Sequence, residues 1–234
     1  MEVTLLSYTP EPEKTVAAAA RLCYSPLSGG ELLENFDDEQ VQIFLARLSS
    51  QGHYSPFEHA SFTFAIDGVS RALSHQLVRH RIASFSQKSQ RYVAEDSFAY
   101  VTPPAIAANK EHKRAFEHLM REIMRQYTAF LADGIAAEDA RYILPNAVAT
   151  NLVLTMNARS LLNFFRLRCC LRAQAEIRQL AQLMLAEVKL VAPALFTKAG
   201  PSCEAEGICY EGNMNCGQKQ AVVRSRQENP AEKG

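Results

Sequence analysis

The chain has 234 residues, 47% of them hydrophobic, which is enough to bury a sizeable core in one large domain or two small ones. Lysine plus arginine and aspartate plus glutamate both number 25, so the formal net charge is zero. This balance argues against nonspecific binding to nucleic acid or to an anionic membrane, which depends on an overall basic field. Any anion binding must therefore be local.

The N-terminus and the apolar segments indicate neither secretion nor a membrane span. Acids stand near the N-terminus where a signal peptide has cations, and the apolar stretch 147–165 is interrupted by Asn151, Asn157 and Arg159. The sequence therefore predicts a cytoplasmic protein. Its six cysteines are expected to be thiols rather than disulfides.

The first half of the chain is predicted to alternate between strands and helices. Strands are expected at 2–8 and 60–67, with a loop at 25–31, a turn at 53–59 and an extended or irregular segment at 84–93. Helices are expected at 11–23, from Asp37 or Asp38 to Gly52, and at 69–80.

The second half is dominated by helical patterns. Residues 105–133 carry the longest apolar stripe, which Gly134 ends. After a short helix that ends at Pro145, a strand is expected at 147–156, and two helices at 157–168 and 173–191. The sequence therefore predicts one α+β domain over residues 1–198. A polar tail that contains three cysteines is expected over residues 199–234.

Residues 79–92, RHRIASFSQKSQRY, gather four permanent cations, one histidine and several hydroxyl and amide groups without an acid. Gln76, Arg79 and His80 share one face of the predicted helix, and Ser89 and Arg91 point the same way if the chain is extended. A hydroxyl beside a guanidinium suits a phosphate. The alternative is a solvated surface turn, which is the usual role of a charge run.

The string RHR at 79–81, followed by seven residues and then SQRY at 89–92, resembles the signature of the flavin-dependent thymidylate synthases. Further segments resemble other motifs of that family in the expected order: HYSPFEH at 53–59, ARYILP at 140–145, NARSLLNFFRLR at 157–168 and AQAEIR at 173–178. The resemblance implies a central, largely antiparallel sheet flanked by long helices. It also implies a homotetramer whose active sites are shared between subunits.

The resemblance further implies an enzyme that converts dUMP to dTMP by reductive methylation. Its carbon donor would be 5,10-methylenetetrahydrofolate, and NADPH would be the reductant through bound FAD. The expected partners are dUMP and folate, with no nucleic acid and no membrane. FAD and the nucleotide both carry phosphates, which would explain the gathering of donors at 79–92.

The resemblance assigns residues to each ligand. The dUMP site would contain Gln76, Arg79, Gln87, Ser89, Gln90, Arg91, Arg141 and Arg168. The FAD site would contain Ser55, Arg79, His80, Arg81, Gln87, Asn157, Arg159, Asn163 and Arg172. Gln87 stands where the family often has an acid.

Arg168 is the residue that the resemblance implies to be catalytic, lying against the uracil ring and offsetting the negative charge that develops there. It follows Arg159 by nine residues, which places the two side chains on opposite faces of a straight helix. Either the helix breaks near Cys169 and Cys170, or each face serves a different active site.

No metal site is predicted. His53, Glu58 and His59 have the wrong spacing for a helical zinc motif, and Pro56 forbids a regular helix between them. The tail pattern C-x5-C-x6-C, at Cys203, Cys209 and Cys216, is a weak zinc signal, so a flexible tail is favoured. The rival interpretations are a noncatalytic nucleotide- or RNA-binding module that uses the 79–91 patch, and a metal-dependent hydrolase.

Overall fold

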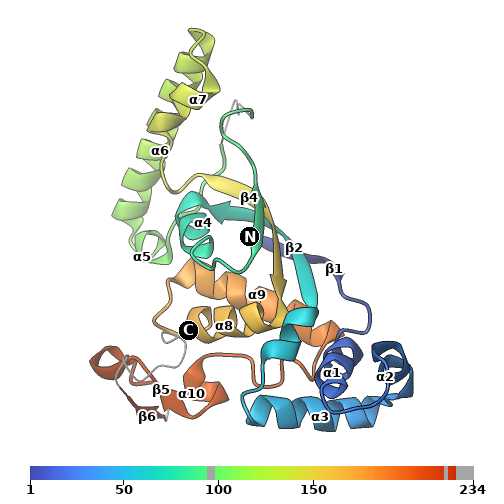
Figure 1. Cartoon of the computed structure of the whole chain (residues 1–234). Coiled ribbons are helices and arrows are strands. Elements are labelled where there is room, and N and C mark those ends of the chain that lie inside the picture. The colour runs from blue at the N-terminus through green and yellow to red at the C-terminus, as the bar shows by residue number, and fades with distance from the viewer. Residues whose placement is uncertain (94–97, 219–220, 225–234) are drawn as a thin grey trace. The chain divides into compact units, whose positions relative to one another are not determined.

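The computed structural model describes residues 1–93, 98–218 and 221–224 (Figure 1). The chain forms two compact units. The first consists of Met1–Val3, Ala65–Arg81 and Phe85–Leu154, and the second consists of Thr4–Phe64, Ile82–Ser84 and Thr155–Gly234. This division does not test the predicted boundary at residue 198, which stays a prediction, and residues 219–220 and 225–234 of the predicted tail lie outside the described residues.

The sheet has four strands in the order β1-β2-β4-β3 and is antiparallel. These are β1 (Glu2–Tyr8), β2 (Ser61–Ser70), β4 (Ala149–Asn157) and β3 (Ser84–Gln87). The predicted α+β class and its largely antiparallel sheet are therefore confirmed.

Alternating burial explains why the two long strands form. In β2 the side chains of Phe62, Phe64 and Ile66 are fully buried while the residues between them are partly exposed. β4 shows the same alternation. On the opposite faces, the hydroxyls of Thr63 and Thr155 are hydrogen-bonded at 2.9 Å. A period of two is the pattern of a half-buried strand, which is why the sequence predicts both strands.

Three helices follow β1 in the second unit: α1 (Pro12–Leu22), α2 (Gly29–Asn35) and α3 (Asp38–Ser50). The predicted loop at 25–31 is wrong in its second half, because α2 begins there. Ser28 accepts a hydrogen bond from the Glu31 N–H, and the Glu31 carboxylate accepts one from the Ser28 N–H. This capping box outweighs the turn preference of two glycines.

Helices α8 (Ala158–Arg168) and α9 (Ala175–Val191) form the rest of the core of the second unit. Phe165 and Phe196 pack edge to face with their ring centroids 5.9 Å apart, and both side chains are fully buried. The chain leaves the helical conformation between Arg168 and Ala175, in line with the two separate helices predicted at 157–168 and 173–191. Arg159 and Arg168 both lie on α8, before this break, so both alternatives for their placement stay open.

The helices of the first unit are α4 (Arg71–Leu77), α5 (Pro104–Ala107), α6 (Lys110–Ala132) and α7 (Ala137–Ala140). The single helix predicted at 105–133 is two helices. Asn109 separates them because its side chain accepts hydrogen bonds from the N–H groups of Glu111 and His112, at 2.9 and 3.0 Å, and so caps α6. Gly134 ends α6 as predicted, with a φ of 84°.

Short elements follow α9 in the second unit. They are α10 (Ser202–Ala205), β5 (Ile208–Cys209), the 3₁₀ turn η3 (Gly212–Met214) and β6 (Val222–Val223). β5 and β6 pair in parallel, with Ile208 opposite Val222. Each element has two to four residues, too few for a periodic sequence pattern. No helix among the described residues is long and apolar enough to span a membrane.

Candidate active site

The predicted RHR segment lies just beyond α4 rather than on it. α4 ends at Leu77, and the N–H groups of Arg79 and His80 donate to the carbonyls three residues earlier, at 3.3 and 3.1 Å. The helical face predicted for Gln76, Arg79 and His80 is therefore wrong, because the chain tightens into a turn after Leu77. Arg79 and Arg81 are exposed and His80 is partly buried.

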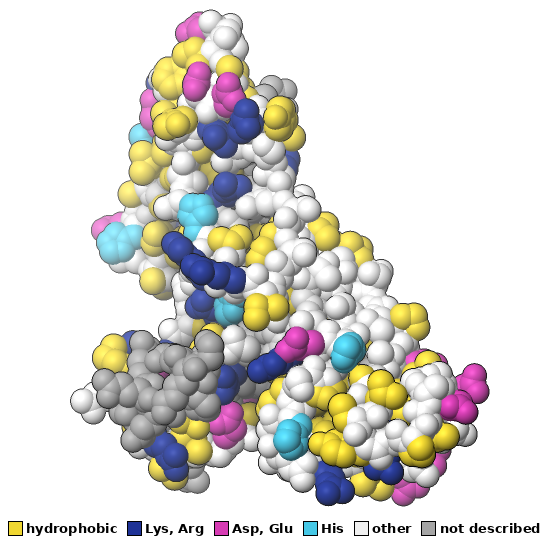
Figure 2. Space-filling model, in the orientation of Figure 1, with side chains coloured by type: hydrophobic (Ala, Val, Ile, Leu, Met, Phe, Trp, Pro, Cys, Tyr) yellow, Lys and Arg dark blue, Asp and Glu magenta, His cyan; other side chains and the backbone are white. Residues whose placement is uncertain are grey.

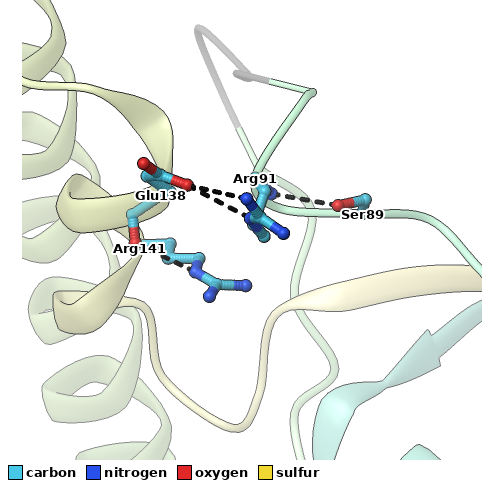
Figure 3. A network of polar contacts seen from close by, with 4 residues as sticks. All are labelled: Ser89, Arg91, Glu138 and Arg141. Carbon is cyan, nitrogen blue, oxygen red and sulfur yellow. Dashed lines mark hydrogen bonds and ion pairs between the residues drawn. The ribbon is translucent and has the colours of Figure 1, made fainter.

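Three of the residues predicted for the dUMP site, Ser89, Arg91 and Arg141, belong to one network of polar contacts with Glu138 in the first unit (Figure 3). The Arg91 guanidinium donates to the Glu138 carboxylate from Nε and forms an ion pair with it from Nη2, both at 3.1 Å. Arg141 donates from Nε to the main-chain carbonyl of Glu138 at 3.0 Å. Both side chains of the Arg91–Glu138 pair are 51% exposed, so a ligand from solvent can reach them.

Ser89 and Arg91 share a turn, not an extended strand. β3 ends at Gln87, after which the Ser89 Oγ accepts a hydrogen bond from the Arg91 N–H at 3.2 Å and the Val93 N–H donates to the Ser89 carbonyl at 3.1 Å. The segment 84–93, predicted to be extended or irregular, is extended as far as Gln87 and irregular beyond it. A serine hydroxyl that bonds the backbone two residues on favours such a turn. Its own proton is not used in that bond.

Gln87 and Gln90 lie beside β4. The Gln87 amide donates to the Thr150 hydroxyl at 3.3 Å, and the Thr150 side chain is 4% exposed. Gln90, Ser89 and Thr150 line a small cavity of about 20 Å³, the size of roughly one water molecule. The buried Thr150 hydroxyl thus fixes the side-chain amide of Gln87, the residue that stands where the family often has an acid.

Arg71 is a third arginine in this region that the sequence analysis missed. Burial lowers its pKa, and the neighbouring charge of Arg141 lowers it further. Ser70 caps α4 by accepting a hydrogen bond from the Leu73 N–H at 3.0 Å, which fixes the start of the helix at Arg71. The only sequence signal for Arg71 was the capping residue Ser70, nine residues before the RHR motif.

In the second unit, the start of α8 lies beside the 3₁₀ helix η1 (Ser55–His59), whose first residue is Ser55. Arg159 forms an ion pair with Glu58, and the two side chains are 54% and 48% exposed. Asn157 caps α8, because its Oδ1 accepts a hydrogen bond from the Ser160 N–H at 2.8 Å. Glu58 therefore pairs with Arg159. Among the described residues, no three or more His, Cys, Asp or Glu side chains are placed to hold a metal ion.

The end of α8 carries the predicted catalytic arginine. Arg168 is partly buried, and this burial lowers its pKa. Five residues earlier on α8, Asn163 accepts a hydrogen bond from Arg166 at 3.4 Å, and Arg166 in turn lies 3.7 Å from the Glu206 carboxylate.

The connection between α8 and α9 carries Arg172, which is exposed. Arg178 of α9 holds this connection, because its guanidinium donates to the carbonyls of Leu171 and Ala173 at 2.9 and 3.3 Å. The sequence analysis gave Arg178 no role, although it closes the AQAEIR segment that resembles the family.

The donors in the two units suit phosphorylated ligands, because guanidinium, amide and hydroxyl groups are the usual partners of phosphate oxygens. Figure 2 shows that Lys and Arg side chains gather in patches, with acidic side chains among them. Among the carboxylates that the structure describes, none forms an ion pair with Arg79, Arg81 or Arg172. The residues present thus fit a dinucleotide cofactor and a nucleotide.

Comparison with a solved structure defines the class. The fold is similar to that of the UMP/dUMP methylase PolB from Streptomyces cacaoi, which was solved bound with 5-Br dUMP. The TM-score is 0.70, with 25% sequence identity over 85% of this chain and 95% of that chain. The fold and the donor-rich segments therefore define an α+β enzyme of the class to which this methylase belongs.

Sequence comparisons identify the family. Residues 4–194 match the family described as thymidylate synthase complementing protein. The flavin-dependent thymidylate synthase of Clostridium tetani is 52% identical over 93% of each chain, and that of Geobacter sulfurreducens is 52% identical over 96% of this chain and 97% of its own. The chain belongs to the family of flavin-dependent thymidylate synthases.

Membership confirms the predicted enzyme class, the conversion of dUMP to dTMP, and the use of FAD, NADPH and methylenetetrahydrofolate. The substrates dUMP and folate are confirmed with it. The individual site residues and the homotetramer stay predictions.

Proposed function

We propose that this chain converts dUMP to dTMP with a nucleotide site built mainly from residues 76–91 and Arg141. Ser89, Arg91 and Arg141 would bind the phosphate, and Arg79 would reach the nucleotide from the turn after α4. Gln76, Gln87 and Gln90 would supply amide groups for the rest of the nucleotide. The observation that carries this assignment is the network of hydrogen bonds that joins Ser89 to Arg91, Arg91 to Glu138 and Glu138 to Arg141 within one compact unit.

We propose that FAD is held by donors from several segments of the chain. They would be Ser55, Arg79, His80, Arg81, Gln87, Asn157, Arg159, Asn163 and Arg172. The ion pair of Arg159 with Glu58 supports this proposal, because it fixes the first turn of α8 beside η1, where Ser55 lies. When bound, FAD supplies the redox chemistry between NADPH and the transferred carbon.

Arg168 is proposed as the catalytic residue. Making C5 of uracil nucleophilic pushes electron density onto the ring carbonyls and N3, and a fixed guanidinium offsets that charge. Partial burial supports this role, because an electrostatic interaction is stronger where water is displaced. The guanidinium stays protonated there, since even a lowered arginine pKa lies far above neutral pH.

We also propose that the enzyme is a homotetramer that shares active sites between subunits and works in the cytoplasm. Arg159 and Arg168 lie nine residues apart on one helix, so their side chains leave α8 on opposite faces. If both arginines bind ligands, the two faces of α8 would contribute to active sites in different subunits. All six cysteines are free thiols, which suits a reducing compartment.

Tritium release from [5-³H]dUMP tests the function directly. With NADPH and methylenetetrahydrofolate, the purified chain should release the label and form dTMP, and omission of either cosubstrate should abolish dTMP. Arg168→Ala should keep FAD bound and remove most dTMP formation. Arg125→Ala is the matched control, since Arg125 lies exposed on α6 and pairs only locally with Glu122. Near-normal turnover of Arg168→Ala would contradict the catalytic assignment.

A further inference from the structure

Five of the six cysteines line one cavity of about 530 Å³ within the second unit: Cys169, Cys170, Cys203, Cys209 and Cys216. They come from the connection after α8, from α10, from β5 and from the segment after η3. The proposed reaction uses none of them. Thiols from four separate places around one cavity call for an explanation other than core packing.

The chain around this cavity has little hydrophobic core of its own. From residue 201 to 218 and from 221 to 224, only Pro201 and Tyr210 are buried. The elements there have two to four residues each, and no disulfide crosslinks them. A small module of this kind usually needs a disulfide or a metal centre to hold one conformation. The cysteines are placed where such a centre would be.

We propose that Cys170, Cys203, Cys209 and Cys216 bind an iron–sulfur cluster. No three or more His, Cys, Asp or Glu side chains in the described part of the chain are placed to hold a single metal ion, so one zinc ion does not fit the arrangement. A cluster is larger than one ion and takes four cysteine thiolates that stand further apart. The cavity volume of about 530 Å³ has room for it.

The surroundings suit a cluster. Arg172 and Lys189 line the cavity and would offset the negative charge that four thiolates bring, and Glu204 and Glu211 line it as well. Cys169 is left out of the ligand set because it is 8% exposed at the C-cap of α8.

The test is the iron and acid-labile sulfide content of the full-length chain purified without oxygen. FAD contains neither element, so bound flavin does not obscure the result. We expect about four iron and four sulfide per chain, the content of a [4Fe–4S] cluster. Electron paramagnetic resonance after dithionite reduction should show the cluster signal. If the purified chain is empty, the same values should be reached by incubation with ferrous iron and sulfide under reducing conditions.

Single Cys→Ser variants identify the ligands. Cys170→Ser, Cys203→Ser, Cys209→Ser and Cys216→Ser should each lose most of the iron and sulfide. Cys23→Ser is the matched control, because Cys23 is exposed at the end of α1 and does not line the cavity. Cys169→Ser should also keep the cluster. Circular dichroism and FAD content of each variant show whether loss of iron reflects a lost ligand or a misfolded chain.

Three outcomes overturn the proposal. The first is a chain that takes up no iron and sulfide even after reconstitution. The second is stoichiometric zinc without iron, which would make this a single-ion site. The third is an iron content that the four variants leave unchanged. Loss of thymidylate synthesis with the cluster intact would instead contradict the proposed nucleotide site, so the two proposals fail separately.

Discussion

Glu138 is the residue that most changes the interpretation of the nucleotide site. The sequence analysis found no acid among residues 79–92, yet the folded chain brings a carboxylate from α7 to Arg91 at 3.1 Å. If Arg91 binds the phosphate as proposed, Glu138 occupies a position that a phosphate oxygen would take on the same guanidinium. The phosphorylated ligand would then compete with Glu138 for Arg91.

Glu138→Gln should raise the affinity for dUMP. The Arg91–Glu138 pair is half exposed, and exposed pairs contribute about 0.2–1 kcal/mol, so the dissociation constant should fall by at most about fivefold. Isothermal titration with dUMP measures this change. Glu122→Gln is the control, because Glu122 forms a similar exposed pair with Arg125 on α6. Weaker binding by Glu138→Gln would show that Glu138 orients Arg91 instead of competing for it.

Ser89→Ala should weaken dUMP binding by about 1–2 kcal/mol, the loss of one hydrogen bond to a charged group. The substitution also removes the acceptor for the Arg91 N–H, so part of the loss would come from a looser turn. Ser86→Ala, at an exposed position of β3, is the matched control. If Ser89→Ala bound dUMP normally but made no dTMP, Ser89 would take part in the chemistry.

At the scale of elements, the strands and long helices were predictable because their patterns are periodic and their ends are marked. Asp37 caps α3 and Gly52 follows it with a φ of 73°, as the sequence indicates. The errors lie where one side chain decides a local conformation: Ser28 starts α2, and Asn109 interrupts a helical stripe. Periodicity carries no information about such hydrogen bonds.

The attachment of α1 to the segment after α9 should depend on pH. Glu13 of α1 accepts a hydrogen bond from the Ala194 N–H at 2.6 Å, yet its pKa is raised, chiefly by burial. The folded chain therefore holds the Glu13 proton more tightly than the unfolded chain does. The stability that protonated Glu13 contributes is present below pH 4.5, the ordinary value, and is lost as the pH rises through the folded pKa.

Glu13→Gln should remove this loss, because an amide accepts the same hydrogen bond without a charge to bury. Denaturant unfolding of both proteins between pH 4 and 7 should show wild type losing stability relative to the variant as the pH rises. Glu2→Gln, at an exposed position of β1, is the control. A wild type that gains stability relative to Glu13→Gln over this range would contradict the prediction.

At the scale of the whole molecule, the class of the fold and the reaction followed from short strings such as RHR at 79–81 and SQRY at 89–92. The convergence of Arg71, Arg141 and Glu138 on that region did not, because nothing in the sequence gives the distance between segments about 50 residues apart. The cysteine cavity was missed for the same reason. Cys170 lies 33 residues before Cys203, and the sequence predicts only that both are thiols.

Assembly is tested by the mass of the native protein. We expect a homotetramer by light scattering, with FAD retained. Mixing inactive Arg168→Ala with an inactive variant at Arg91 should restore activity if one site takes these two residues from different subunits, because mixed tetramers then contain some intact sites. A strictly monomeric active enzyme, or mixed tetramers without any activity, would contradict shared sites.

The carboxylate beside Arg91 has one more consequence. A guanidinium that carries its own counter-ion exposes less bare positive charge, so inorganic phosphate and sulfate should be poor inhibitors compared with nucleotides, whose base and sugar bring further contacts. When product leaves, Glu138 can pair with Arg91 again and help to prevent rebinding. The chain thus carries its own carboxylate that competes with the nucleotide for Arg91.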